Sequence, residues 1–335
     1  MAIIFHPRYL DHYQNSYHPE SPERLLAINT KLDEERLNRE VLTPEPASEN
    51  DLEKIHTPTH INFIKNVGEG RIDLDTVSHE ETFEIALLAC GGALLAADNS
   101  FFERKPAMGL LRPPGHHAGA DYCGGFCYFN NIALAAQHLL DKVKRVAIVD
   151  IDVHHGNGTS DIFCKRKDVL YISTHEWGIF PGTGPVNYVG EGEGEGYTVN
   201  IPFPSRTGDM SYTLAWEEII EPILDQFKPE ALLMSVGGDA HYMDPLASLT
   251  LSSLGYVSLA EKLIRCAKRF CDGRVSFYLE GGYHTGALAD IICGIVGKFY
   301  DKETPIFFSE VYDLDTLGRE TINELKEIQR RYWKL

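Results

Sequence analysis

The sequence predicts an α/β fold in which a mainly parallel β-sheet is covered by helices on both faces. Short apolar runs rich in β-branched and aromatic residues alternate with helical patterns, and this alternation is typical of parallel sheets. Polar clusters directly follow several runs, where sites in α/β folds lie. With 335 residues, 43% of them hydrophobic, the chain can bury a large core, and we expect one domain over residues 1–335.

Seven apolar runs are short enough and rich enough in β-branched and aromatic residues to be strands. In chain order they are Ala2–Phe5, Met108–Leu111, Val146–Asp150, Val169–Ser173, Tyr197–Ile201, Leu232–Val236 and Val275–Leu279. The carboxyl ends of parallel strands share one edge of a sheet, so the residues that follow these runs should meet in space although they are far apart in sequence.

Helical patterns lie between the strands. Ser21 followed by Pro22 predicts a helix start, with the serine as N-cap and the proline in the first turn, and the pattern continues to about Leu37. Two further helices are expected over Phe83–Ala97 and Ile132–Leu140. The charged C-terminal segment, near residues 320–334, predicts a peripheral helix.

The charge balance argues against one class of partner and favours another. Lys and Arg number 31 and Asp and Glu number 49, which gives a net charge of −18. No basic stripe interrupts this balance, so we expect no direct binding to nucleic acid. An acidic protein attracts cationic substrates, such as Lys-rich peptides or polyamines.

The cysteines and the apolar segments indicate a cytoplasmic protein. Seven cysteines without a Cys-x-x-Cys pair predict neither a disulfide framework nor a thiolate zinc site. The apolar run within Met1–Pro7 is too short for a signal peptide, and no stretch approaches the roughly 18 apolar residues of a membrane span. We therefore expect no membrane contact, while a homo-oligomer is compatible with the sequence.

The most informative motif follows the strand that ends at Asp150. Asp150, Asp152 and His154 recur at a period of two, so on an extended strand their side chains point to one side. A single aspartate there could equally be structural or bind a ribose, but three aligned ligand types favour a metal. With Asp239, which follows the strand 232–236, the set of Asp152, His154 and Asp239 leaves a position open for water and substrate. These donors suit Zn²⁺ and also Fe²⁺ or Mn²⁺.

Two other strands also end in reactive side chains. His116 and His117 can act as general base and acid, and a carboxylate such as Asp150 can fix the tautomer of one of them. Tyr283, after two glycines, can donate a hydrogen bond to a developing oxyanion. Taken singly, the histidines could cap a helix and the tyrosine could pack in the core. Their joint occurrence after separate strands predicts one active site.

These segments resemble the histone deacetylase family, and the chain is nearer to its class II and acetylpolyamine amidohydrolase branches than to class I. The matching segments are Arg112–Ala118, Gly125–Asn131, Asp150–Gly158, Phe180–Gly184, Asp239–Pro245 and Leu279–Tyr283. The resemblance implies the arginase/deacetylase-like fold, a three-layer α/β sandwich with a mainly parallel central sheet.

The resemblance also implies roles for individual residues. Asp152, His154 and Asp239 would bind zinc, His116 and His117 would be the catalytic pair, and Tyr283 would polarise the amide carbonyl. The supporting residues would be Asp150 for His116 and Asn157 for His117. In the family pattern, Gly125, Phe126 and Phe180 would line a narrow tunnel for an alkyl chain, Arg24 would lie near an internal acetate pocket, and Asp150 and Ser173 would help to bind K⁺.

The chain departs from the family pattern before the third ligand. The usual Gly-Phe-Asp reads Gly237-Gly238-Asp239 here, which we expect to remove an aromatic wall but no ligand. Tyr283 stands where some relatives carry histidine, which argues for a competent enzyme. An arginase-like site with two metals is weakened, because its second-metal carboxylates are replaced by the Asp-x-Asp-x-His order at 150–154 and by His241.

The sequence therefore predicts a zinc-dependent amidohydrolase that removes an acetyl group, or another short acyl group, from primary-amine side chains. The leading substrate is acetyl-lysine in proteins or peptides, and acetylpolyamine is the alternative. A binding module that reads acetyl-lysine without hydrolysis is disfavoured by Tyr283 and the His pair. Leu246, after Asp244-Pro245, stands where polyamine-selective relatives can carry an acidic residue. This apolar rim residue favours lysine, whereas the net charge attracts both substrates.

Overall fold

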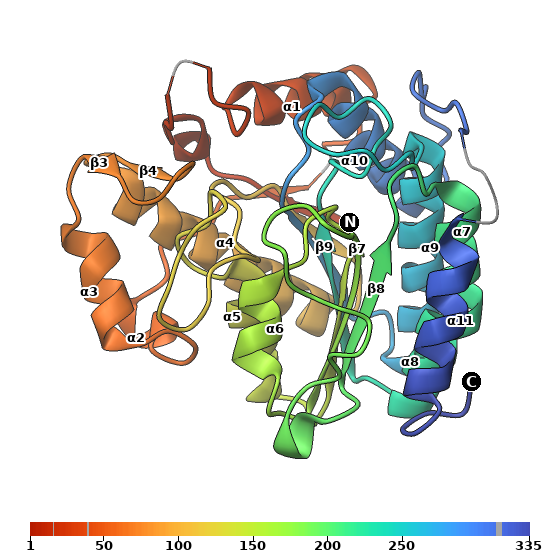
Figure 1. Ribbon diagram of the computed structural model, residues 1–335. Helices are drawn as coiled ribbons and strands as arrows, with labels where there is room; N and C mark the ends of the chain where they lie inside the picture. The colour runs from red at the N-terminus through yellow and green to blue at the C-terminus, as the bar shows by residue number, and fades with distance from the viewer. Residues whose placement is uncertain (16, 39, 313–316) are drawn as a thin grey trace.

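A sheet of eight parallel strands organises the computed structural model, which describes residues 1–15, 17–38, 40–312 and 317–335 (Figure 1). The strand order is β2-β1-β5-β10-β9-β6-β7-β8. The strands are β1 (Ala2–Ile4), β2 (Val41–Leu42), β5 (Ala107–Gly109), β6 (Val146–Asp150), β7 (Val169–Glu176), β8 (Thr198–Phe203), β9 (Ala231–Val236) and β10 (Val275–Leu279). The predicted parallel α/β class is confirmed.

All seven expected strands are present, but some of them begin or end at other residues than expected. β6 and β10 have the expected bounds, whereas β7 continues to Glu176, where its polar and ionisable residues are also buried. The edge strand β2 and the small antiparallel hairpin of β3 (Gly70–Arg71) and β4 (Val77–Ser78) were not predicted. Each has two residues, which is too short to show a period in the sequence.

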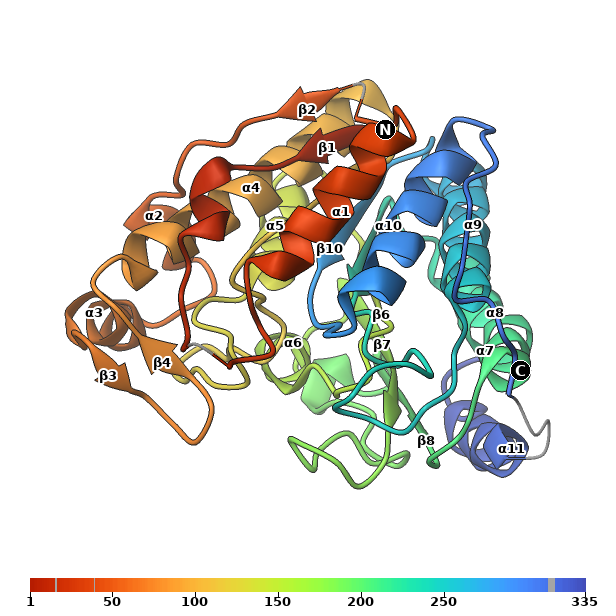
Figure 2. The same cartoon turned by 90° about the horizontal axis from the view of Figure 1, so that it is seen from above.

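Helices cover both faces of the sheet, which gives three layers (Figures 1 and 2). One face carries α4 (Thr82–Glu103), α5 (Asn131–Leu140) and α6 (Asn157–Phe163), and the other carries α1 (Glu23–Glu34), α8 (Glu221–Phe227), α9 (Ser253–Phe270) and α10 (Thr285–Phe299). The remaining α-helices of the described chain are α2 (Glu49–Leu52), α3 (Pro58–Asn66), α7 (Asp209–Ala215) and α11 (Leu317–Gln329).

Helix α1 differs from the expectation at both ends. Its N-cap is Pro22, without a side-chain capping bond, so the predicted serine cap is wrong. The helix stops before Leu37 because Arg36 adopts a left-handed conformation with φ of 52°. The Leu37 amide then donates to the carbonyl of Leu32 at 2.8 Å, and both leucine side chains are buried. In this Schellman motif, Leu37 packs against the last turn although it lies outside the helix. The apolar pattern in the sequence therefore continued beyond the true helix end.

Helix α4 is longer and more apolar than expected. By length and composition alone it could cross a membrane, with a mean hydropathy of 1.6 over its most apolar stretch, so the expectation that no such stretch exists was wrong. In the protein, 61% of that stretch is buried. The helix packs against α5, β5 and β10, and its apolar character follows from this position between the sheet and a second helix.

Helix α11 covers the edge strand β8 and begins a few residues earlier in the chain than the predicted helix near 320–334 (Figure 1). Ile322 and Leu325 are fully buried in the core. The Gln329 amide donates to the carbonyl of Thr198 in β8, at 3.4 Å. The helix is thus a structural cover for the sheet edge.

We expect Leu325→Ala to lower the free energy of unfolding by about 2–4 kcal/mol, because a fully buried leucine is replaced by a cavity. Chemical denaturation measures this change. Glu324→Ala, at an exposed position of the same helix, is the matched control and should change stability by less than about 0.5 kcal/mol. Equal effects of the two variants would show that α11 does not pack as described.

Candidate active site

The loops that follow β5, β6, β9 and β10 meet at the carboxyl edge of the sheet, as expected from parallel strands. Backbone amides join them. The Gly281 amide donates to Oδ2 of Asp152 at 2.9 Å, and the Val153 amide donates to Oδ1 of Asp239 at 3.1 Å. The Gly115 amide donates to Oε2 of Glu280 at 2.7 Å. Four segments that are distant in sequence therefore form one cluster.

Asp152, His154 and Asp239 form a group that could hold a metal ion, with one ligand atom from each within 4.8 Å of the others. His154 Nδ1 lies 3.2 Å from a carboxylate oxygen of Asp152 and 3.2 Å from one of Asp239. We expected Asp152 and His154 to continue the strand, with their side chains on one side of it. Instead β6 ends at Asp150, and the residues that follow form a loop. Asp150 accepts the Asp152 amide and Asp152 accepts the His154 amide, which shapes that loop.

The surroundings of this triad fit a divalent cation. The Asp152 and Asp239 side chains are 1% and 0% exposed, so their negative charges lie close together away from water. Burial and the charge of Asp152 raise the pKa of Asp239. A Cβ at Gly237 would stand 1.9 Å from Oδ2 of Asp152, and one at Gly281 would stand 2.2 Å from Oδ2 of Asp239. The two glycines therefore leave the space that the carboxylates occupy.

The adjacent histidines are held by different groups. His116 Nδ1 lies 3.1 Å from Oδ2 of Asp150, and His117 Nδ1 lies 2.7 Å from Oδ1 of Asn157. The centroids of the two imidazole rings are 4.0 Å apart. The structure thus places the supporting residues next to the histidines for which they were predicted.

Because their hydrogen-bond partners differ, the pKa values of the two histidines shift in opposite directions. Burial lowers the pKa of His116, but the charges of Asp152, Asp150 and Glu280 outweigh it and raise the pKa to about 10. Burial also lowers the pKa of His117, which has no carboxylate bonded to its ring, and the neighbouring His116 lowers it further. The neighbouring carboxylates therefore favour the charged form of His116, whereas burial favours the neutral form of His117.

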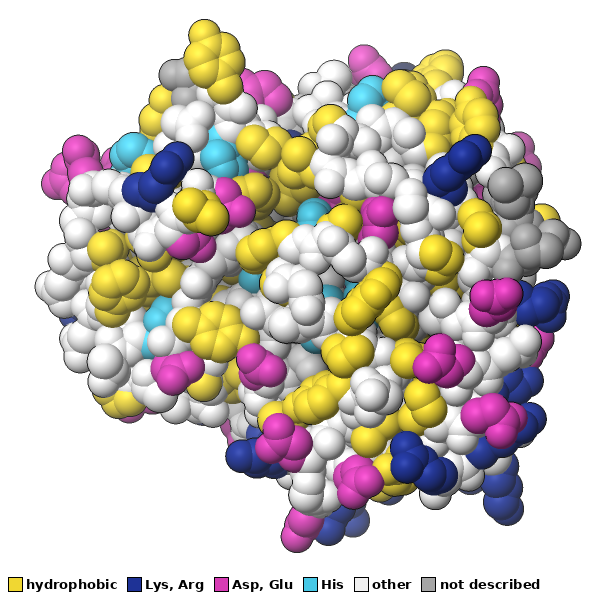
Figure 3. Space-filling model, in the orientation of Figure 1, with side chains coloured by type: hydrophobic (Ala, Val, Ile, Leu, Met, Phe, Trp, Pro, Cys, Tyr) yellow, Lys and Arg dark blue, Asp and Glu magenta, His cyan; other side chains and the backbone are white. Residues whose placement is uncertain are grey.

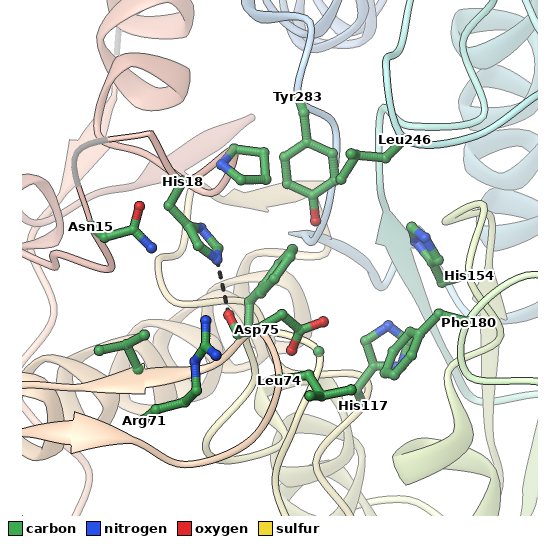
Figure 4. A pocket seen from close by; sticks show the side chains of 14 residues that line it. Asn15, His18, Arg71, Leu74, Asp75, His117, His154, Phe180, Leu246 and Tyr283 are labelled. Atoms are coloured by element: carbon green, nitrogen blue, oxygen red, sulfur yellow. Dashed lines mark hydrogen bonds between the residues drawn. The ribbon is translucent and has the colours of Figure 1, made fainter.

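A cavity of about 390 Å³ leads to this cluster (Figure 4). Its lining residues are Asn15, His18, Pro19, Arg71, Leu74, Asp75, Val77, His117, Gly125, Phe126, His154, Phe180, Leu246 and Tyr283. The Tyr283 hydroxyl points into the cavity, with His154 and His117 on the wall opposite His18 (Figure 4). The expected substrate-side residues 125, 126, 180 and 246 all line it.

Part of the cavity wall is built from aromatic rings and a glycine. The Phe126 ring lies edge-on to Tyr283 at 5.9 Å, and the Phe180 ring lies edge-on to His117 at 5.0 Å. Gly125 has φ of 55°, and a Cβ there would stand 2.5 Å from the His117 ring and 2.9 Å from Phe180. Glycine therefore allows the backbone to approach both rings.

A family model described as histone deacetylase domain matches residues 18–299, which include all four loops of the cluster. The chain belongs to the histone deacetylase family. The fold and the motif resemblance seen in the sequence are thereby confirmed.

The chain is similar to deacetylases named in archaea and plants. It is 40% identical to a probable deacetylase of Archaeoglobus fulgidus, over 99% of this chain and 98% of the relative. It is 38% identical to histone deacetylase 10, chloroplastic, of Oryza sativa, over 92% of this chain and 75% of the relative. The crystal structure of the HDA15 HD domain matches with a TM-score of 0.90 and 32% identity, covering 99% of this chain and 94% of that one.

Two buried carboxylates of this candidate site were missed in the sequence. Glu280 accepts the backbone amides of Gly115 and His116, at 2.7 and 3.1 Å. Asp244 accepts the amides of Tyr283 and Leu246, at 2.6 and 3.0 Å. Burial is the main cause that raises the pKa of each carboxyl group to about 7. Glu280 follows a predicted strand directly, and that position was the available signal.

Arg24 contacts the backbone of the loop that carries Tyr283. Its fully buried guanidinium donates to the carbonyls of Gly282 and Gly281, at 2.7 and 2.8 Å, and pairs with Glu20. Its Cζ is 5.2 Å from the centroid of the Tyr283 ring. The contacts show a residue that fixes this loop, while the expected link to an acetate pocket stays a prediction.

The expectation that Gly238 removes an aromatic wall from the site was wrong. A Cβ at this position would stand 2.8 Å from Cδ1 of Leu288 and 3.4 Å from Cδ1 of Ile291, both on α10. A side chain at 238 would therefore point into the helical layer. Glycine in place of the usual phenylalanine therefore changes the packing between this loop and α10.

We expect Gly237→Ala to weaken Zn²⁺ binding by about 10- to 100-fold, because the new methyl group must displace the Asp152 carboxylate. Equilibrium dialysis against zinc measures the affinity. Gly238→Ala is the matched control, since the closest atom to its methyl group would be Cδ1 of the flexible Leu288 side chain, and no carboxylate of the triad is among its nearest neighbours. Unchanged zinc affinity in Gly237→Ala would mean that Asp152 is not a ligand.

Proposed function

We propose that residues 1–335 form one zinc-dependent deacetylase domain, which removes acetyl groups from lysine side chains of proteins or peptides. The observation that carries the proposal is the position of the Asp152, His154 and Asp239 triad, whose histidine lines the cavity together with His117 and Tyr283. Membership of the deacetylase family gives the reaction class. Metal, site roles and substrate are inferred from the residues.

The triad would hold the metal through two carboxylates and one imidazole. Zinc fits this donor set, and Fe²⁺ is the alternative. When bound, such an ion polarises a carbonyl oxygen and lowers the pKa of a water molecule towards roughly 7. We also propose a structural K⁺ near Asp150 and Ser173, which are direct neighbours across the β6–β7 pair.

The two histidines have different roles, with His117 transferring the proton and His116 supplying a positive charge. His117 is neutral, and with its Nδ1 held by Asn157 its Nε2 is left to accept a proton from the attacking water. His116 keeps a positive charge beside Asp150 and stabilises the negative charge that develops nearby. His117 can then return the proton to the leaving amine.

Tyr283 supplies the hydrogen bond to the oxygen of the acetyl group. Burial and the charge of Asp239 raise the pKa of this phenol, so the hydroxyl stays a donor throughout the working pH range. Its backbone amide is anchored by Asp244, which fixes the ring relative to the triad. A donor placed for the transition state contributes roughly 2.7–4 kcal/mol.

The cavity walls favour the alkyl stem of lysine. Gly125, Phe126 and Phe180 provide close apolar contacts for a methylene chain, and Leu246 at the rim is 42% exposed. One observation favours acetylpolyamine as the second candidate: the Asp75 carboxylate lies in the cavity lining, where it could attract a second amine. We give Leu246 more weight, because a charged residue there is what a polyamine needs along its chain.

We further propose a cytoplasmic enzyme. All seven cysteines are free, as expected in a reducing compartment. On the surface seen in Figure 3, Lys and Arg side chains gather at the lower right, towards α11, and are sparse elsewhere. Some of these basic side chains are paired with acidic ones, as in the Lys326–Glu218 and Arg330–Glu327 ion pairs. Together with the net charge of −18, this pairing supports the expectation that nucleic acid is not a direct partner.

Zinc-loaded protein should hydrolyse a fluorogenic acetyl-lysine peptide, chelation should abolish turnover, and added zinc should restore it. We expect Tyr283→Phe and His117→Ala each to lower kcat by about 10²-fold or more, with bound zinc near stoichiometric. Asp239→Ala should lose both zinc and activity. Full turnover after chelation, or zinc loss in Tyr283→Phe, would contradict the assignment. Binding of the peptide without hydrolysis would indicate a binding module.

The substrate preference is tested by comparing kcat/KM for an acetyl-lysine peptide and for acetylspermidine. We expect the peptide to be the better substrate of the wild-type enzyme. Leu246→Glu should shift the preference towards acetylspermidine, because a rim carboxylate attracts the second amine. Leu246→Gln, which is polar but uncharged, is the matched control. A wild-type enzyme that prefers acetylspermidine would support the second candidate instead.

A further inference from the structure

A chain of hydrogen bonds runs from His117 to the protein surface. Asn157 Oδ1 lies 2.7 Å from His117 Nδ1, and the Nδ2 amide of Asn157 donates to the Tyr122 hydroxyl at 3.1 Å. The Tyr122 hydroxyl donates to Oδ2 of Asp161 at 2.5 Å. The imidazole is buried, Asn157 and Tyr122 are half-buried, and Asp161 is exposed.

The carboxylate at the outer end sets the direction of every bond in this chain. An ionised carboxylate only accepts, so Tyr122 must donate its single proton to Asp161. The Tyr122 oxygen can then only accept, which requires the NH₂ group of Asn157 on that side and its carbonyl oxygen towards His117. That oxygen needs a donor, so His117 carries its proton on Nδ1.

Packing and hydrogen bonds hold the Tyr122 hydroxyl between Asn157 and Asp161. Its ring packs over Gly119, where a Cβ would stand 2.3 Å from the tyrosine ring. Asn157 and Asp161 lie one turn apart on α6, so both contact the same hydroxyl. Burial and the adjacent Asp161 raise the pKa of Tyr122, which keeps the phenol protonated.

We propose that Tyr122 and Asp161 are positioning residues that hold Asn157 in one amide orientation and thereby keep His117 as the Nδ1–H tautomer. This inference rests on the proposed function, in which Nε2 of His117 accepts the proton. His116 needs no such relay, because Asp150 bonds it directly and a carboxylate can only accept. An asparagine is ambiguous, and its reversed orientation would present N–H groups to Nδ1 and favour the inactive Nε2–H tautomer.

The tautomer is measured directly by long-range ¹H–¹⁵N NMR of zinc-loaded protein with ¹⁵N-labelled histidine. The wild-type His117 should show the Nδ1–H pattern, and Tyr122→Phe should show a substantial Nε2–H population. We expect kcat of Tyr122→Phe to fall by about 10-fold, as is typical for loss of an outer hydrogen-bond partner, with KM and bound zinc unchanged. Asp161→Ala, which leaves the tyrosine packing intact, should shift the tautomer in the same direction.

The controls separate this role from a general structural one. Tyr332→Phe removes another tyrosine hydroxyl bonded to an exposed carboxylate, that of Glu195, and should change neither the spectrum nor kcat. In an Asn157→Asp background the imidazole again faces an acceptor-only group, so adding Tyr122→Phe should change kcat by less than about 2-fold.

The NMR result also stands apart from the proposed function, because a tautomer shift without any deacetylase activity would refute the function and leave the relay intact. An unchanged His117 spectrum in both Tyr122→Phe and Asp161→Ala would overturn the relay. An equal loss of kcat on adding Tyr122→Phe to the wild-type protein and to the Asn157→Asp variant would overturn it too.

Discussion

A cluster of buried carboxyl groups at the carboxyl edge of the sheet is the constraint on which the rest of the site depends. Carboxylates from three strand ends and their following loops are almost completely buried: Asp150, Asp152, Asp239, Asp244 and Glu280. Removing such groups from water is costly unless donors or cations replace the lost hydration. The protein supplies backbone amides, histidine rings and, in our proposal, a divalent ion.

The backbone amides that donate hydrogen bonds to these carboxylates belong to the loops that form the site. Asp244 accepts hydrogen bonds from the amides of both Tyr283 and Leu246, so the two residues, which both line the cavity, share one anchor. Glu280 likewise holds the backbone of His116 from a different strand. Because charge compensation and loop positioning use the same bonds, these irregular segments keep a defined geometry without helices or strands.

The sequence alone predicted the parts of this arrangement that depend on local pattern. The strands and the candidate triad of Asp152, His154 and Asp239 could be recognised because β-branched runs, and ligand types at strand ends, are visible in short segments of the sequence. The roles of Asp244 and Tyr122 could not, since each depends on a backbone amide or side chain from a distant part of the chain. The direction of position 238 was misjudged for the same reason: sequence spacing does not say which layer a loop residue contacts.

The helix on the sheet edge bears on how copies of this protein can associate. An uncovered edge strand presents unpaired backbone groups to other chains and invites sheet extension or aggregation. Here α11 packs along β8, and Gln329 bonds a β8 carbonyl, while the opposite edge is β2, with two residues. Neither edge offers a long template for strand addition, so a homo-oligomer of this deacetylase would have to form through its helical layers or loops.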